Sequence, residues 1–178
     1  MPIAFDAASD NGSLGGPATS LTWSHTCTGT NRILFACFFG HTTDVVTGVT
    51  YNSVAMTFVN KILNTADRYI YIYMLVNPSS GANNIVASAS ENSLWRGLGV
   101  SYTGALQTGQ PDASGTDSDT AVTSLTTTIT TIAENCWAVL LAKSNPGDPE
   151  AGTGSTLRET GGGNGISVFD SNGPLAAG

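Results

Sequence analysis

The sequence predicts an all-β protein, an antiparallel β-sandwich of jelly-roll-like character that forms a single domain over residues 1–178. Short strand-forming segments recur between Gly, Asn, Ser and Pro along the whole chain. Charged residues make up only 11% of the chain, while Thr, Ser, Asn and 21 Gly are abundant, which is typical of strands and turns. At 178 residues and 40% hydrophobic content, the chain is long and apolar enough for one buried core.

Two segments are apolar on both faces and therefore predict central strands, which we expect to be core partners of each other: residues 33–39 and 136–142. Residues 21–27 alternate large side chains with small polar ones, which predicts a strand with one buried face. We expect this strand to form a hairpin with the segment 32–39, because only the turn 28–31 separates them.

The remaining strands follow from alternation and turn residues. A second hairpin is expected around Asn52 and Ser53. In the segment 68–76 both faces are apolar, one of them carrying tyrosines, so both should be covered. The further strands expected in chain order lie at residues 3–7, 45–51, 54–60, 68–76, 84–90, 95–103, 121–131 and 166–170.

Two long segments lack any period and predict loops. Residues 104–120 are polar and form the first. Residues 144–165, which include the run Gly161-Gly162-Gly163-Asn164-Gly165, predict a flexible loop. The short strand 166–170 is followed by a turn, so we expect an unpaired edge that a missing last strand or a neighbouring subunit covers.

Charge and cysteine content exclude several classes of function. The net charge of −7 disfavours nucleic acid and anionic lipid as partners. No apolar window is long enough to span a membrane, and the first residues lack a signal peptide, so the chain is expected to be made in cytoplasm. Cys27, Cys37 and Cys136 are expected to be free thiols, and no cofactor or structural zinc is indicated.

The candidate metal ligands are Asp112, Asp117 and Asp119, whose carboxylates lie close together in one loop and could hold calcium. The alternative is a solvated turn with Asx hydrogen bonds, because the spacing does not match the helix-flanked calcium loop. His25 and His41 could act as bases, with Asp44 close to His41, yet no nucleophile motif accompanies them. We therefore expect no enzyme and no catalytic residues.

A set of structural segments carries a resemblance to a known family. The segments, in chain order, are residues 4–7, 20–26, 31–34, 49–57, 100–104 and 111–114. Together they resemble a poorly characterised family of β-sandwich proteins that tailed bacteriophages and phage-derived bacterial genes encode. The resemblance implies a β-sandwich in a virion, either as a head decoration protein or as a tail-associated protein.

The expected function is thus that of a non-enzymatic structural protein of a phage particle, located in the virion. Its expected partners are copies of itself and a phage capsid or tail protein. The alternative is a carbohydrate-binding or host-adhesion module, with Tyr69, Tyr71 and Tyr73 as a stacking platform for a glycan if their face is exposed. A buried sheet face is the other interpretation of these tyrosines.

Overall fold

The computed structural model describes residues 2–12, 14, 16–40, 42–63, 68–120 and 122–177. Within these ranges the regular structure is entirely β, and every strand pair is antiparallel. The strands are β1 (Ala4–Asp10), β2 (Ala18–Cys27), β3 (Ile33–Phe39), β4 (Val46–Tyr51), β5 (Val54–Ala55), β6 (Thr57–Leu63), β7 (Tyr69–Val76), β8 (Gly81–Ser93), β9 (Arg96–Thr103), β10 (Val139–Lys143), β11 (Thr156–Thr160) and β12 (Ile166–Asp170).

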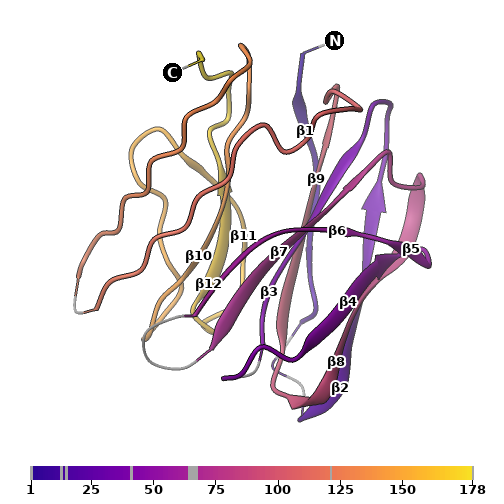
Figure 1. The fold of residues 1–178 in the computed structure, drawn as a ribbon, viewed down its shortest axis with the longest axis vertical. Helices are drawn as coiled ribbons and strands as arrows, with labels where there is room; N and C mark the ends of the chain where they lie inside the picture. Colours follow the sequence, from indigo (N-terminus) through magenta and orange to yellow (C-terminus); the bar gives the residue numbers. More distant parts are fainter. Residues whose placement is uncertain are drawn as a thin grey trace.

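The strands form three sheets, which Figure 1 shows as three layers side by side. The middle layer is the five-stranded sheet β1-β9-β3-β7-β6, and the four-stranded sheet β2-β8-β4-β5 packs on one of its faces. This pair confirms the predicted antiparallel β-sandwich. The three-stranded sheet β10-β12-β11 covers the other face of the middle sheet and adds a layer that the sequence did not predict.

The middle sheet is buried on both faces, and β3 shows this most clearly. Leu34, Ala36 and Phe38 belong to the core between the middle and four-stranded sheets, whereas Cys37 and Phe39 belong to the core shared with the third sheet. A strand with two buried faces needs apolar residues at every position. The prediction of a central strand at residues 33–39 is therefore confirmed.

The predicted hairpin between residues 21–27 and 32–39 is wrong. The first segment lies in β2, which pairs with β8 in the four-stranded sheet. The second is β3, which pairs with β7 and β9 in the middle sheet. The chain crosses from one layer to the other between them, because the buried face of β2 packs against the middle sheet rather than alongside it.

The second predicted hairpin is half confirmed. β4 and β5 pair around Asn52 and Ser53, whose φ angles of 48° and 64° give the left-handed backbone that a tight hairpin turn requires. β5 ends at once, however, and β6 pairs with β7 in the middle sheet. The segment 54–60 is thus shared between two layers, which neither its alternation nor its turn could show.

The third sheet corrects three predictions for the C-terminal part of the chain. The expected loop 144–165 contains the strand β11. The strand at 166–170 is β12, which has β10 on one side and β11 on the other, so the predicted bare edge does not occur there. The strand predicted at 136–142 begins only at Val139, and its Leu141 shares a core with β3 as expected.

The Thr-rich strand predicted at residues 121–131 is absent from the described part of this segment, 122–131, and Ala121 lies outside the described residues. The described residues of 106–132 instead form an excursion without regular strand, which we call the arm (Figure 1). Its two legs run close together, since a Cβ on Gly115 would lie 3.0 Å from Cγ2 of Ile129. A segment of strand-forming residues becomes a β-strand only where it can pair with the open edge of another strand.

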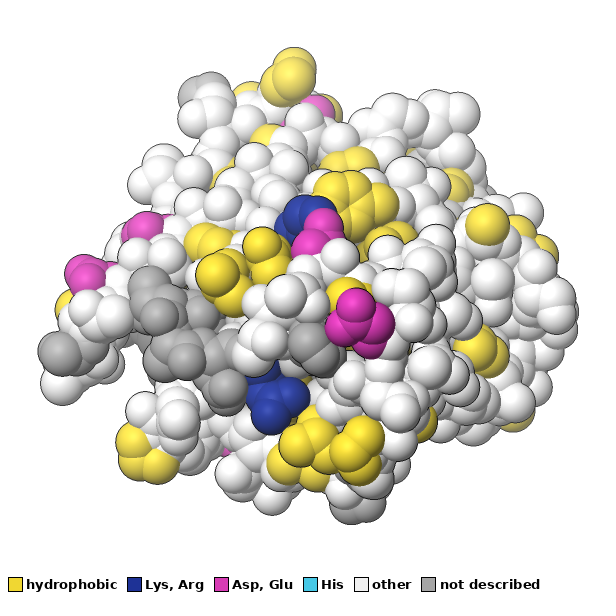
Figure 2. Space-filling model, turned by 60° about the horizontal axis from the view of Figure 1, so that its bottom comes forward, with side chains coloured by type: hydrophobic (Ala, Val, Ile, Leu, Met, Phe, Trp, Pro, Cys, Tyr) yellow, Lys and Arg dark blue, Asp and Glu magenta, His cyan; other side chains and the backbone are white. Residues whose placement is uncertain are grey.

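The surface carries apolar side chains in separate patches. Figure 2 shows several such patches, rather than one continuous apolar area, on the end of the molecule that it brings forward. All three cysteines are free thiols, as predicted. Across the described ranges, no helix of the length and hydropathy needed to cross a bilayer is found.

The close approach of β9 to β2 yields a first prediction. A Cβ on Gly97 would lie 2.7 Å from Leu21 Cδ2 and 2.9 Å from Trp23 Cη2, both in the core. Gly97→Ala should therefore lower the free energy of unfolding by about 1–3 kcal/mol through overpacking, as a fall in the urea midpoint. The matched control is Gly48→Ala, also in a strand, where an added Cβ meets nothing within 4 Å. An equal loss in both variants would contradict the close packing.

Candidate functional site

His25 lies between the two sheets of the sandwich and is the centre of a buried polar cluster. Its side chain is 1% exposed. It projects from β2 toward the middle sheet, where β9 offers only small residues at Gly99 and Ser101. A Cβ on Gly99 would lie 2.9 Å from the Nδ1 atom of His25, so only glycine leaves space for the imidazole. The small residues Gly99 and Ser101 of β9 therefore leave room for the His25 side chain of β2.

A chain of hydrogen bonds fixes the tautomer of His25. Ser101 Oγ donates to Asp6 Oδ2 at 2.8 Å, so its oxygen is left to accept from Nε2–H of His25 at 3.0 Å. The other ring nitrogen, Nδ1, then accepts from Ser9 Oγ at 2.8 Å. Thr28 donates its backbone N–H to the Asp6 carboxylate at 2.8 Å and its hydroxyl to the same group. Ser9 thus donates to His25, His25 donates to Ser101, and Ser101 donates to Asp6.

This order of groups is that of a serine nucleophile beside a base, but the surroundings do not suit catalysis. Burial lowers the pKa of His25 from 6.5 to about 4, and the charge of Asp6 opposes part of that shift. An imidazole with so low a pKa is a weak general base. Of two cavities, one at the end of β3 and one at the β4–β5 turn, neither is lined by Ser9 or His25. The cluster ties β1 and β9 to β2.

The three aspartates predicted as calcium ligands are not brought together. Among the described residues, no group of three or more His, Cys, Asp and Glu side chains is placed to hold a metal ion. Asp112 Oδ2 accepts from the backbone N–H of Ile132 at 2.5 Å and of Ala133 at 3.1 Å, and these bonds lower its pKa. The Asp112 carboxylate therefore joins the two legs of the arm through these hydrogen bonds.

The other two aspartates of that set face their own backbone. Asp117 Oδ1 accepts from the N–H of Ser118 at 2.8 Å, and Asp119 Oδ1 from that of Thr120 at 2.6 Å. These local bonds agree with the solvated-turn alternative. The calcium prediction is thus not supported by the geometry, since the carboxylates satisfy backbone donors instead of converging on one point.

Of the three tyrosines considered as a glycan platform, Tyr71 and Tyr73 are buried and Tyr69 is half-buried. Tyr71 is 1% exposed and Tyr73 is 9% exposed, both in the core beneath the four-stranded sheet. Burial raises the pKa of Tyr71 and of Tyr73, with the charge of Asp44 adding to the shift. The buried-face interpretation is confirmed for these two side chains. His41, the other histidine considered as a base, lies outside the described residues.

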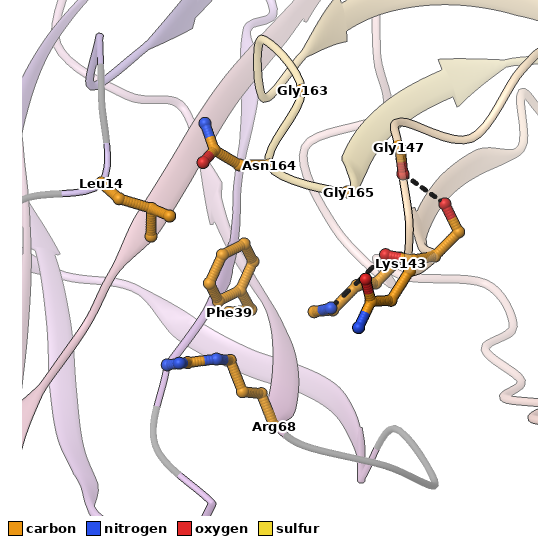
Figure 3. A pocket seen from close by; sticks show the side chains of 10 residues that line it. Leu14, Phe39, Arg68, Lys143, Gly147, Gly163, Asn164 and Gly165 are labelled. Atoms are coloured by element: carbon orange, nitrogen blue, oxygen red, sulfur yellow. Dashed lines mark hydrogen bonds between the residues drawn. The ribbon is translucent and has the colours of Figure 1, made fainter.

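A cavity that the sequence did not predict lies at the end of β3, between the middle and third sheets. It has a volume of about 230 Å³ and is lined in part by Phe39, Arg68 and Lys143. The Arg68 guanidinium carbon lies 5.6 Å and the Lys143 ammonium 5.3 Å from the centre of the Phe39 ring. Figure 3 shows these two cationic side chains beside the ring, with Leu14 and Asn164 across the cavity.

The wall of this cavity is built by the glycine-rich run that the sequence predicts to be flexible. The Asp148 carboxylate accepts from the backbone N–H groups of Gly163 and Gly165, each at 2.6 Å, and of Ile166 at 3.1 Å. Ser144 N–H donates to Gly165 O at 2.8 Å. The predicted flexible loop is therefore held by specific bonds, because one carboxylate satisfies several of its donors.

Comparisons with protein-family models, with curated proteins and with solved structures find no match to this chain. The resemblance to a phage family therefore stays a prediction from the sequence segments that carry it. The sequence could have pointed to the cavity only through the glycine run near Lys143. Arg68 lies far from both along the chain, so no motif connects these residues.

The His25 cluster gives a prediction about pH. The folded state holds His25 neutral down to about pH 4, whereas the unfolded chain binds a proton below about pH 6.5. Stability should therefore be complete above pH 6.5 and fall by about 3 kcal/mol as the pH drops from 6.5 to 4. Urea unfolding of the wild type and of His25→Asn measures this, and the variant should lack that part of the pH dependence.

The control for this measurement is a direct titration of the His25 imidazole. An NMR titration of folded wild-type protein should show the His25 ring protons unchanged from pH 7.5 to pH 5. A midpoint near pH 6.5, or stability curves that stay parallel for wild type and variant, would contradict the buried neutral histidine.

Proposed function

We propose that the chain is a non-enzymatic structural protein of a phage particle, a capsid decoration or tail-associated surface protein that assembles with copies of itself and with the particle. The particle context is supported by the sequence resemblance. The structural role is supported by the use of the polar side chains, since His25, Asp112 and Asp170 all hold parts of the fold together. The virion is then the place where it acts, after synthesis in the host cytoplasm.

The observation that carries the assembly proposal is the arm. Its described residues from 114 to 128 are all exposed to solvent. They include Val122 and Leu125, which are 48% and 53% exposed. Ile132, at the end of the arm, is 81% exposed. A long polypeptide with this much exposed apolar surface is poorly suited to remain in water and well suited to lie against another protein.

The sequence of the arm also indicates how it would bind. Residues 122–131 are rich in Thr with Val, Leu and Ile, the composition of a β-strand, yet they have no strand partner within the described part of the chain. Such a segment can complete a sheet by pairing with the open edge of another copy. β6 offers such an edge, because among the described strands it pairs with β7 alone. It also carries Phe58 and Leu63, at 47% and 44% exposure.

The alternative of a carbohydrate-binding or host-adhesion module has less support than the assembly role. Tyr71 and Tyr73 are buried in the sandwich, and the aspartates of the 112–119 loop do not form a calcium site in the described structure. An enzyme is likewise not favoured, because His25, which bonds to both Ser9 and Ser101, is enclosed and its imidazole has a pKa of about 4. We therefore retain the assembly role.

The assembly proposal is tested by the mass of the native protein in solution. Light scattering after size-exclusion chromatography should give a multiple of the 18.2 kDa chain mass. Leu125→Asp should shift the protein to the single-chain mass, because a charge on the arm cannot be buried in an interface. Circular dichroism should show that this variant keeps its β-structure, since Leu125 lies outside the core.

Leu140→Asp is the matched control, because Leu140 is 44% exposed but belongs to β10 and not to the arm. It should leave the mass unchanged. The particle context is tested separately by sedimentation with phage particles that lack the protein, which wild type should join and Leu125→Asp should not. A wild type that stays single-chain at every concentration and never sediments with particles would overturn the proposal.

A further inference from the structure

We propose that Asp112 is the positioning residue of the arm, a latch that ties its two legs together and so presents residues 122–131 for pairing with a second copy of this chain. The Asp112 carboxylate lies near the base of the first leg, and the backbone that it binds lies at the end of the second leg. Such a latch has a role only if the chain assembles, so it rests on the proposed function.

The latch consists of one carboxylate oxygen and the donors of the second leg. Asp112 Oδ2 accepts from the backbone N–H of Ile132 at 2.5 Å and of Ala133 at 3.1 Å, and the thiol of Cys136 lies 3.5 Å from the same oxygen. The backbone hydrogen bonds lower the pKa of Asp112, so the carboxylate is ionised at neutral pH. Hydrogen bonds to an ionised acceptor are stronger than those between neutral groups.

Beyond the latch, no further hydrogen bond joins the two legs in the described residues 113–120 and 122–130. The hydrogen bonds of these residues are those of Asp117 and Asp119 to the backbone N–H of the next residue. The legs approach each other through the contact of Gly115 with Ile129. Asp112 is therefore the side chain whose hydrogen bonds hold the legs together.

Both legs of the arm are also bonded at their base to other parts of the chain. In the first leg, Gln107 Nε2 donates to Arg32 O at 3.3 Å. At the end of the second leg, Thr131 is 8% exposed and donates its hydroxyl to Ala176 O at 3.0 Å. A hydrogen bond between two legs that are fixed at the base restricts the directions in which the arm can point.

The latch leaves the backbone of the second leg available for a partner. In residues 122–130, all of which are described, no backbone N–H or C=O takes part in a hydrogen bond. Free backbone donors and acceptors along one segment are the groups through which a peptide adds a strand to the edge of a sheet. The partner that we assign to them is the β6 edge of a second copy.

The latch acts on assembly by limiting the conformations of the arm before it binds. A flexible segment loses conformational entropy when it pairs with a partner, and a segment that is already held in place loses less. Asp112 touches no residue of the interface that we assign, so its removal should weaken association without removing a contact. We expect the dissociation constant between copies to rise at least about tenfold in Asp112→Ala.

The test measures the latch and the assembly separately in the full chain. Hydrogen exchange followed by NMR should be at least about tenfold faster at the Ile132 and Ala133 amides in Asp112→Ala than in the wild type, because the acceptor of both amides is gone. A dilution series in the analytical ultracentrifuge gives the dissociation constant. Asp112→Asn keeps one acceptor oxygen without the charge, so both of its values should lie between those of wild type and Asp112→Ala.

Asp117→Ala is the matched control, since it removes the same negative charge from the same arm but only the local bond to Ser118. A loss of charge also reduces repulsion between acidic copies, and this control measures that effect alone. It should leave exchange at Ile132 and Ala133 unchanged and should not weaken association.

The failure of the latch and the failure of assembly give different results. Unchanged exchange at Ile132 and Ala133 in Asp112→Ala, or equal dissociation constants in Asp112→Ala and Asp117→Ala, would overturn the latch while assembly of the wild type stands. A wild type that stays at the single-chain mass at every concentration would overturn the proposed function, and the positioning role of Asp112 with it, whatever the exchange rates.

Discussion

The rest of the structure depends on burial of the middle sheet on both faces. β3 lies between β9 and β7 and carries apolar residues at all seven positions, so neither face tolerates water. The four-stranded sheet covers one face and the three-stranded sheet covers the other. The C-terminal strands are therefore no appendage, because without β10 and β12 one whole side of β3, including Cys37 and Phe39, would be exposed.

Apolar burial alone does not fix the position of one sheet relative to the next. At each boundary between sheets, a cluster of polar side chains fixes that position. Between the middle and four-stranded sheets, His25 accepts from Ser9 and donates to Ser101. At the boundary with the third sheet, Asp170 is 1% exposed and accepts from Tyr102 OH at 2.9 Å and from Arg158 Nε at 2.7 Å. A sliding of the sheets would break these hydrogen bonds and leave buried polar groups unpaired. The free-energy cost of such unpaired groups therefore opposes the sliding.

Alternation in the sequence reveals strands well and their partners poorly. It identified β3, β7 and β9 because the side-chain period depends only on neighbours along the chain. It failed for the hairpin of β2 with β3, since a short turn connects strands of different sheets as easily as strands of one sheet. It also missed β11, whose five residues include Arg158 and Glu159, because an ion pair with Asp170 there replaces the apolar contact that the pattern requires.

The candidate sites show the same division between local and long-range information. That His25 is satisfied rather than reactive could be anticipated from the alternation of its strand. The placement of Arg68 and Lys143 beside the same Phe39 ring could not, because only the packing of two layers brings them there. The glycine-rich run depends on long-range packing as well, since Gly161 and Gly165 sit so close to Ile166 and Ser144 that no Cβ fits. Two of the four glycines of this run thus allow close packing, whereas Gly162 and Gly163, with φ angles of 60° and 88°, supply the left-handed backbone that favours glycine.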